Sequence, residues 1–179
     1  SGYLPEHTLA AKAMAHAMGA DFIEQDVVLS RDGVPVVLHD VYLDDTTDVS
    51  RRFPDRARED GHFYAMDFML EELRQLRVHE RSRHSGSERE QAVYPGRFPV
   101  ESALFGIPTL AEEIDLIAGL DRSRGRSTGL YVELKGPGLH LQAGMDIAAI
   151  VPNVLAEKGY ADRPRQVFLQ CFDGPTLQR

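Results

Sequence analysis

The sequence predicts an α/β protein in which short apolar strands alternate with helices, and polar residues cluster at the strand ends. The strand-like runs span residues 22–29, 34–38, 129–135 and 166–172. This alternation is typical of parallel α/β folds. Polar groups at the carboxyl ends of several strands favour a (β/α)8 TIM-type barrel over an open sheet. A complete barrel needs about 250 residues, whereas this chain has 179, so we expect an incomplete barrel that is a fragment of a longer protein.

Capping signals mark the ends of the predicted helices. Thr8 can cap a helix over residues 8–18, which Gly19 would end. Thr109, followed three residues later by Glu112, forms a capping box at the start of a second helix over residues 110–120.

A third helix is predicted before the last strand. It should run over residues 142–158, where Ile147, Val151 and Val154 are apolar. Pro152 lies inside this stretch and should kink or break the helix, because proline lacks the backbone N–H that a helix interior needs.

The first two strands are too close in sequence for a parallel crossover. Such a crossover takes a dozen or more residues, and residues 27–33 provide only seven. The chain must therefore return in extended form, reverse at Arg31-Asp32-Gly33 and run back through Val36. No helix fits between these two strands.

The stretch from residue 48 to about residue 105 differs in character, because it is dense in charge. Residues 71–78 are helix-like, with Leu73 and Leu76 on one face. Residues 81–91 are polar and contain serine and glycine, so we expect a flexible loop there. Such a length is unusual for a loop in a compact domain. We interpret residues 48–105 as an insertion over the mouth of the barrel.

Two carboxylates interrupt the first strand. Glu24 and Asp26 are two positions apart and point to the same face, while Ile23 and Val27 on the other face look buried. Adjacent carboxylates repel unless a cation lies between them, and Ca²⁺ and Mg²⁺ prefer oxygen ligands. His39, at the end of the neighbouring strand, can move a proton beside such a metal. Each feature alone is more often a solvated face or a loop residue, but together they predict a site.

An ordered set of motifs runs through the first quarter of the chain. It consists of Gly19-Ala20-Asp21, Ile23-Glu24-x-Asp26-Val27, Asp32-Gly33, Val37-x-His39-Asp40, Leu43 and Thr46-Thr47. This order resembles the glycerophosphodiester phosphodiesterase family. Residues 1–8 and 94–99 resemble its periplasmic bacterial branch in particular. The resemblance covers nearly the whole chain and implies an insertion after the strand carrying His39, together with a periplasmic or secreted location.

The resemblance also implies roles for particular residues. Glu133 matches a third acidic metal ligand beside Glu24 and Asp26, and Lys135 matches a cation that steadies the phosphate. Without the resemblance, Glu133 and Lys135 would form an ordinary salt bridge across the sheet. Glu6 would lie near the metal and the substrate, or would simply be an acid at a helix start. The branch favours Ca²⁺ over Mg²⁺ as the divalent metal.

The implied reaction is the metal-assisted hydrolysis of a glycerophosphodiester, such as glycerophosphocholine, to glycerol 3-phosphate and an alcohol. His39 would be the general acid or base. Phe172, at the end of the fourth strand, would face the glycerol moiety or pack in the core. Two alternatives stay open: a related barrel phosphodiesterase acting on lysophospholipid or sphingomyelin, and a non-catalytic metal-binding barrel. The charged insertion argues mildly against a membrane substrate.

One expected motif is missing from these residues. The family begins with His-Arg-Gly, whose histidine is a second proton-transfer group and whose arginine contacts phosphate. Ser1-Gly2-Tyr3 corresponds to the residues just after that motif. We therefore expect His-Arg-Gly upstream of Ser1, and we expect the 179 residues alone to be inactive or poorly folded.

Bulk properties argue against two kinds of partner, and the resemblance implies a small-molecule glycerophosphodiester substrate. The net charge of -8 argues against a nucleic acid, and no stretch approaches the roughly 20 apolar residues of a membrane span. A homodimer is compatible with the sequence. Cys171 is the single cysteine and is predicted to be a buried apolar group. The histidines without a partner pattern are predicted to lie on the surface: His7, His16, His62, His79, His84 and His140.

Overall fold

A four-stranded sheet runs through the computed structural model, which describes residues 2–85, 88–100, 102 and 104–178. β1 (Phe22–Leu29) pairs in parallel with β5 (Gly129–Leu134), and β5 pairs in parallel with β6 (Val167–Gln170). β2 (Pro35–Val37) runs antiparallel to β1, which gives the strand order β2-β1-β5-β6. The predicted extended return between the first two strands is therefore confirmed.

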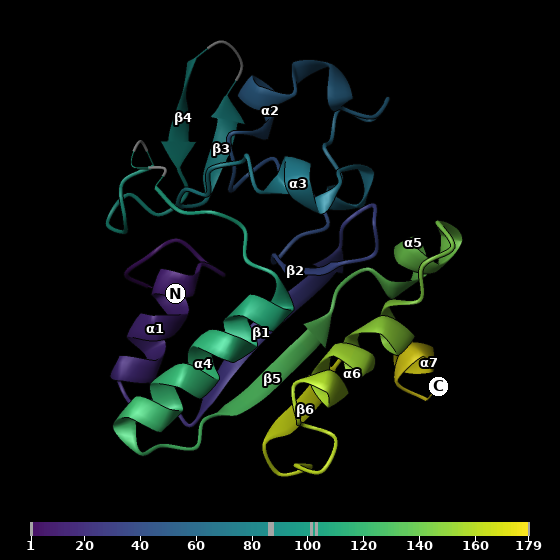
Figure 1. Cartoon of the computed structure of the whole chain (residues 1–179). Helices are drawn as coiled ribbons and strands as arrows, with labels where there is room; N and C mark the ends of the chain where they lie inside the picture. The colour runs from purple at the N-terminus through teal and green to yellow at the C-terminus, as the bar shows by residue number, and fades with distance from the viewer. Residues whose placement is uncertain (1, 86–87, 101, 103, 179) are drawn as a thin grey trace.

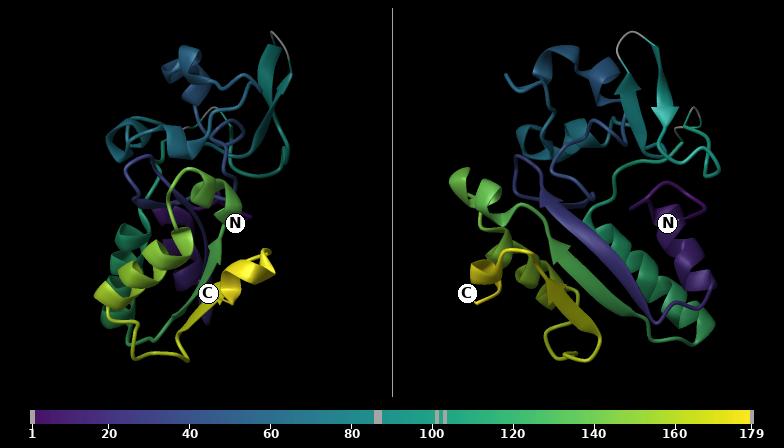
Figure 2. Two further views of the ribbon diagram at one scale, coloured as in Figure 1. Left: turned by 90° about the vertical axis from the view of Figure 1, so that its right-hand side faces the viewer. Right: turned by 180° about the vertical axis from the view of Figure 1, so that it is seen from behind.

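Helices cover one face of the sheet and leave the opposite face open (Figures 1 and 2). α4 (Leu110–Arg124) and α6 (Ile147–Glu157) lie on the covered face, and α1 (Leu9–Ala17) packs beside α4. α5 (Pro137–Gln142) follows β5, and α7 (Gly174–Leu177) follows β6. In the right-hand view of Figure 2, the open face of the sheet is turned toward the reader. The alternation of strands and helices confirms the predicted α/β class.

The predicted caps form at the two helices that flank the site. The Thr8 hydroxyl accepts a hydrogen bond from the backbone N–H of Ala11 at 3.2 Å, which starts α1. Thr109 Oγ1 accepts from the Glu112 N–H at 3.1 Å, and Glu112 Oε2 accepts from the Thr109 N–H at 2.9 Å. This reciprocal pair is the predicted capping box, although α4 continues to Arg124, beyond its predicted end.

The predicted helix over residues 142–158 is wrong in its extent, because the chain forms α5 and α6 instead. The break falls at residues 143–146, where Gly144 adopts a left-handed φ of 80° and Asp146 caps α6. Pro152 lies inside α6 rather than at the break. We attribute its tolerance to tertiary packing, since the apolar face of α6 is buried against the sheet and compensates for the lost backbone hydrogen bond.

The residues between β2 and α4 form a lobe above the sheet in Figure 1. We call this segment the lobe. Its elements are α2 (Val49–Arg52), η1 (Pro54–Arg56), η2 (Ala65–Asp67), α3 (Leu70–Leu73), β3 (Ser82–Ser85) and β4 (Glu88–Ala92). Its hydrophobic core, in which Leu43, Phe68 and Leu76 are fully buried, also includes Val28 of β1 and Val36 of β2. That the lobe is an insertion stays a prediction.

Two predictions within the lobe are wrong. Residues 81–91 are not an irregular loop throughout, because β3 and β4 pair as an antiparallel hairpin on either side of residues 86–87, which lie outside the described part. The helix predicted over residues 71–78 shrinks to the single turn of α3. Leu73 and Leu76 are nevertheless both buried. The apolar pattern therefore predicted the burial of these side chains correctly and the length of the helix incorrectly.

The main core lies between the sheet and its helices, and Ile23, Val27 and Leu130 are among its buried residues. Full burial of each such side chain contributes about 1.5–3 kcal/mol to folding. Cys171 is only partly buried against this core, and its thiol donates to the Leu134 carbonyl. The surface prediction is wrong for four histidines, which are buried or nearly so: His7, His16, His79 and His140. His62 is exposed as predicted, and the side chain of His84 lies outside the described part.

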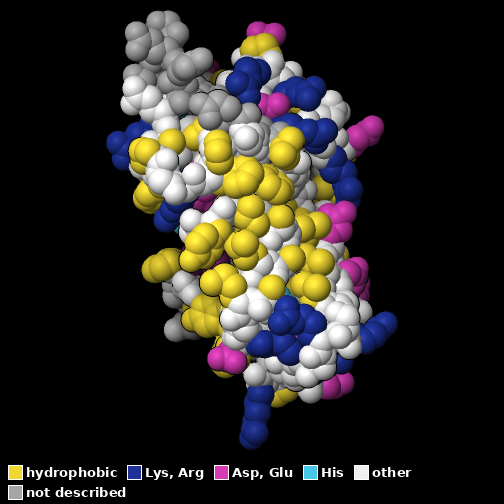
Figure 3. Space-filling model, turned by 90° about the vertical axis from the view of Figure 1, so that its left-hand side faces the viewer, with side chains coloured by type: hydrophobic (Ala, Val, Ile, Leu, Met, Phe, Trp, Pro, Cys, Tyr) yellow, Lys and Arg dark blue, Asp and Glu magenta, His cyan; other side chains and the backbone are white. Residues whose placement is uncertain are grey.

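Hydrophobic side chains also gather on the outside of the molecule. Figure 3 shows them on the side where α1 and the segment before α4 lie. Leu9, Met14 and Leu104 are exposed large hydrophobic residues of these segments. The open face of the sheet carries others, namely Phe22, Tyr131 and Phe168, whose rings contact one another. Within the described residues, no helix combines the length and the apolar character that crossing a membrane requires.

Candidate active site

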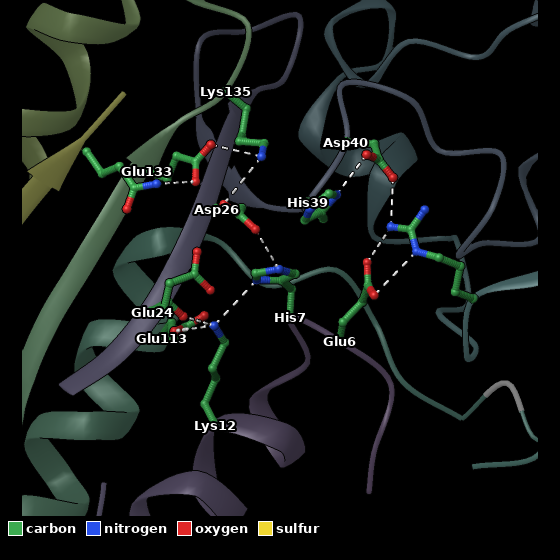
Figure 4. Close-up of polar contacts among 12 residues, drawn as sticks. Glu6, His7, Lys12, Glu24, Asp26, His39, Asp40, Glu113, Glu133 and Lys135 are labelled. Carbon is green, nitrogen blue, oxygen red and sulfur yellow. Dashed lines mark hydrogen bonds and ion pairs between the residues drawn. The ribbon is translucent and has the colours of Figure 1, made fainter. Parts of the chain in front are cut away.

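Three acidic side chains meet on the open face of the sheet (Figure 4). Glu24 and Asp26 alternate along β1 with Ile23 and Val27, which belong to the core on the covered face. Asp26 is in register with Glu133 on β5, so their side chains are neighbours across the sheet. The structure therefore places the three predicted metal ligands on one face, but among the described residues only Glu24 and Asp26 of the three belong to the close cluster of possible ligands, whose third member is His7.

Lys135 bridges the carboxylates of the two strands. Its Nζ donates to Glu133 Oε1 at 2.9 Å and lies 3.7 Å from Asp26 Oδ1. Gln170 on β6 donates to Glu133 Oε2 at 3.0 Å, which fixes that carboxylate from the other side. Burial lowers the pKa of Lys135, but Glu133 and Asp26 outweigh burial and the net pKa is raised, so Lys135 stays cationic.

The paired carboxylates of β1 differ in charge state. Burial and the adjacent Asp26 raise the pKa of Glu24 to about 7. Burial also acts to raise the pKa of Asp26, but the hydrogen bond and charge of His7, the hydrogen bond with Glu24 and the charge of Lys135 together outweigh it and lower the pKa to about 2. Asp26 is thus ionised at neutral pH, while Glu24 is held between its two states by the negative charge beside it.

His7 is the functional residue that sequence reasoning missed. Its Nε2 lies 2.9 Å from Asp26 Oδ2, and its side chain is only 9% exposed. His7, Glu24 and Asp26 each present a ligand-capable atom, and these atoms lie within 4.8 Å of one another. The ring reaches this position because His7 adopts a φ of 56° just before α1. In the sequence, its only signal was its place beside Glu6.

His39 lies at the edge of the same site, with its side chain 49% exposed. Its Nδ1 is 2.8 Å from Asp40 Oδ1, and this hydrogen bond raises the pKa of His39. Asp40 is in turn held by Arg81 of the lobe, which also binds Glu6 at 2.5 Å. The ring of His39 lies 6.4 Å from that of His7, centroid to centroid.

The other predicted site residues are placed less clearly. Glu6 is held by Arg81 at the lobe side of the site, as Figure 4 shows. Phe172 lies beyond the end of β6 and is 86% exposed, so it is not a core residue. Its contact with a glycerol moiety stays a prediction.

The donor set fits a hard divalent cation. Asp26 Oδ1 is buried and makes no hydrogen bond among the described residues, although the Lys135 ammonium lies 3.7 Å away. A buried polar atom of this kind is costly unless a charge satisfies it. Glu24 and Glu133 add further carboxylate oxygens, which Ca²⁺ and Mg²⁺ prefer.

The fold and the site together define a class: an α/β protein of the TIM-barrel type with an acidic cluster on the face that would line the barrel. The sequence model of the glycerophosphoryl diester phosphodiesterase family matches residues 1–179. The chain belongs to this family.

The curated relatives agree with this family. A glycerophosphodiester phosphodiesterase from Haemophilus influenzae is 45% identical over 179 residues, which are all of this chain and 49% of that protein. One from Treponema pallidum is 44% identical over all of this chain and 50% of its own length. The chain thus spans about half the length of the curated relatives it matches.

A solved structure supports the same architecture. It is a phosphodiesterase from Oleispira antarctica in complex with the product sn-glycerol-3-phosphate, with a TM-score of 0.67 and 30% identity. The match covers 99% of this chain and 56% of that one. This likeness confirms the predicted barrel fold and the prediction that the chain is only part of a barrel, because the chain matches about half of that protein.

Proposed function

We propose that this chain carries half of the active site of a metal-dependent phosphodiesterase, which hydrolyses glycerophosphodiesters such as glycerophosphocholine to glycerol 3-phosphate and an alcohol. The observation that carries the proposal is the meeting of Glu24, Asp26 and Glu133 on one face, with a half-exposed His39 at its edge. The names of the relatives and the glycerol 3-phosphate in the Oleispira complex support the substrate class.

The three carboxylates would hold the cation, for which we favour Ca²⁺ over Mg²⁺. A bound divalent cation supplies charge stabilisation to the phosphoryl oxygens. Lys135, kept cationic by its acidic neighbours, adds a second positive charge on the same side. Glu6 borders the same region and would contact the substrate or the metal through water.

His39 would transfer the proton to or from the ester oxygen. Its Nδ1 is engaged by Asp40, so its Nε2 is the atom left to face the substrate. A carboxylate partner raises the pKa of His39, which favours its protonated form and hence the role of general acid for the departing alcohol. Phe172, which is exposed just beyond the end of β6, would cover the glycerol carbons.

The test uses the full-length protein that contains this chain. Glycerol 3-phosphate release from glycerophosphocholine should require Ca²⁺, cease with a chelator and fall by roughly 10²- to 10⁴-fold in His39→Ala. His62→Ala is the matched control, because His62 is another exposed histidine with a nearby aspartate. Release that persists unchanged in His39→Ala would overturn the assigned role. Calcium binding without release in the wild type would instead indicate a non-catalytic barrel.

Two further properties belong to the same proposal. The likeness of residues 94–99 to the periplasmic branch supports a periplasmic or secreted location, which cell fractionation tests. A homodimer is proposed as the working state, and light scattering of the full-length protein decides it. Comparing soluble glycerophosphocholine with micellar lysophospholipid or sphingomyelin separates the proposed substrate from the membrane alternatives.

A further inference from the structure

A buried lysine stands directly behind the acidic site. Lys12 lies on α1 and is only 6% exposed. Its Nζ donates to the backbone carbonyl of Glu24, lies 3.4 Å from His7 Nδ1 and lies 3.4 Å from Glu113 Oε1. The first two contacts are hydrogen bonds, and the contact with Glu113 is an ion pair without a hydrogen bond. Lysine is rarely buried to this degree unless it is paired.

Glu113 supplies the countercharge from a different helix. It lies on α4, its side chain is fully buried, and no other cation is among the groups that contact its carboxylate in the described part. Burial raises the pKa of Glu113 and the Lys12 ammonium opposes this. The pair therefore links α1 to α4 and holds Lys12 against β1, as Figure 4 shows.

Lys12 and Asp26 together determine which nitrogen of His7 carries the proton. An ammonium can only donate, so His7 Nδ1 must accept from Lys12. A carboxylate that serves as a metal ligand can only accept, so His7 Nε2 must carry the hydrogen that it donates to Asp26 Oδ2. Both ring nitrogens are thus committed, and His7 has no lone pair left for a metal in spite of its place in the cluster.

We propose that Lys12 is a positioning residue, which holds the ring of His7 from Nδ1 so that Nε2 binds one oxygen of Asp26 and leaves the other oxygen for the cation. Three observations carry this step: the buried ammonium, the imidazole committed at both nitrogens, and Asp26 Oδ1, which makes no hydrogen bond and has the Lys135 ammonium at 3.7 Å. Partners of this kind orient a ligand and tune its affinity for the metal. The relevance of Lys12 to hydrolysis rests on the proposed function, but the contacts among Lys12, His7 and Asp26 do not depend on it.

The competing explanation is that Lys12 and Glu113 only fasten α1 to α4. A double variant separates the two, because Lys12→Met with Glu113→Leu removes both charges and replaces the buried pair by apolar groups of similar size. Such replacements are often tolerated, whereas removal of one partner leaves an uncompensated buried charge. Lys158→Met is the matched control, because Lys158 forms an exposed ion pair with Asp115 on the same helix α4.

The experiment measures the ¹⁵N chemical shifts of the His7 ring and the calorimetric affinity for Ca²⁺ in the full-length protein, with His7→Gln used to assign the resonances. The wild type and Lys158→Met should show a single tautomer protonated at Nε2. In the double variant Asp26 still holds the hydrogen at Nε2, but Nδ1 no longer accepts from Lys12, so the ¹⁵N shift of Nδ1 should change and Ca²⁺ should bind about 10- to 100-fold more weakly. An unchanged His7 spectrum together with Ca²⁺ affinity within twofold of wild type would overturn the proposal.

These readouts are independent of catalysis. A wild type that shows the expected tautomer and binds Ca²⁺ but hydrolyses no glycerophosphocholine would refute the proposed function and leave the role of Lys12 standing. If the wild type hydrolyses glycerophosphocholine but the double variant keeps the His7 spectrum and the Ca²⁺ affinity of the wild type, the role of Lys12 is refuted and the proposed function stands. A double variant that unfolds is replaced by Lys12→Gln with Glu113→Gln, which removes both charges and keeps both side chains polar, judged by the same spectrum and the same limit.

Discussion

Arg81 Nη2 lies 2.7 Å from Asp40 Oδ2 and thereby ties the lobe to the end of the strand that carries His39. The same guanidinium binds Glu6 and approaches Asp45 at 3.3 Å. Because Asp40 is the hydrogen-bond partner of His39, a residue of the lobe sets the orientation of the imidazole. The lobe is thus a structural part of the site and not only a cover beside it.

Replacing Arg81 by alanine should reduce turnover of glycerophosphocholine by about 10- to 100-fold, because a freed Asp40 no longer fixes the imidazole for proton transfer. Calcium affinity should change little, since Arg81 does not contact the carboxylates of β1 or β5. Steady-state kinetics and calorimetry measure the two quantities. Arg83→Ala, an exposed arginine in the same hairpin, is the control. Equal losses in both variants would contradict the prediction.

Replacing Asp26 by asparagine should weaken Ca²⁺ binding by more than about 100-fold. The change removes the charge of a ligand and also alters the hydrogen bond with His7. Loss of a residue that only supports a ligand typically lowers metal affinity by 10- to 100-fold, so loss of the ligand charge should lower it further. Calorimetric titration of Ca²⁺ into the full-length protein measures the effect. Glu71→Gln, on the exposed surface of α3, should bind Ca²⁺ as the wild type does. Retained affinity in Asp26→Asn would exclude Asp26 as a ligand.

His140 should make the protein less stable in acid. Burial lowers its pKa from 6.5 to about 4. Above pH 6.5 the imidazole is neutral in both the folded and the unfolded state and contributes nothing. Below that pH only the unfolded state takes up the proton, so the free energy of unfolding falls until pH 4 and then levels off. Between pH 7 and pH 5 the loss should be about 2 kcal/mol.

Urea unfolding at pH 7 and pH 5 tests this loss. In the wild type, His140 Nε2 accepts a hydrogen bond from the Leu29 N–H at 3.4 Å. The variant His140→Gln keeps an acceptor for this N–H, but its side chain does not titrate. Between pH 7 and pH 5, the free energy of unfolding of His140→Gln should therefore fall by about 2 kcal/mol less than that of the wild type. His62→Gln removes an exposed histidine and should leave the pH dependence as it was. An identical pH dependence in wild type and His140→Gln would refute the assignment.

Replacing Thr109 by alanine should destabilise the protein by about 1 kcal/mol, because the capping box at the start of α4 is lost. Chemical denaturation of the full-length protein measures this change. Ser123→Ala lies at the exposed end of the same helix and should change stability by less than about 0.5 kcal/mol. A loss in Ser123→Ala as large as that in Thr109→Ala would show that the cap is not the cause.

Much of the fold followed from short-range patterns. The strand periods, the caps at Thr8 and Thr109 and the antiparallel return after β1 each depend on a few neighbouring residues, and all three are confirmed. The failures lie where tertiary packing outweighed local preference. A stretch of polar residues paired into the β3–β4 hairpin, and Pro152 was held inside α6 by its buried face.

The site divides in the same way. By itself, the sequence determined that Glu24 and Asp26 share a face and that an imidazole ends the next strand, because alternation along a strand is a property of the backbone. Only the tertiary structure showed that His7 is not a surface residue but contacts Asp26, and that Lys12 and Glu113 form a buried ion pair beside it. The physical reason is that these contacts join α1, β1 and α4, and no periodicity within one segment reports where another segment will pack.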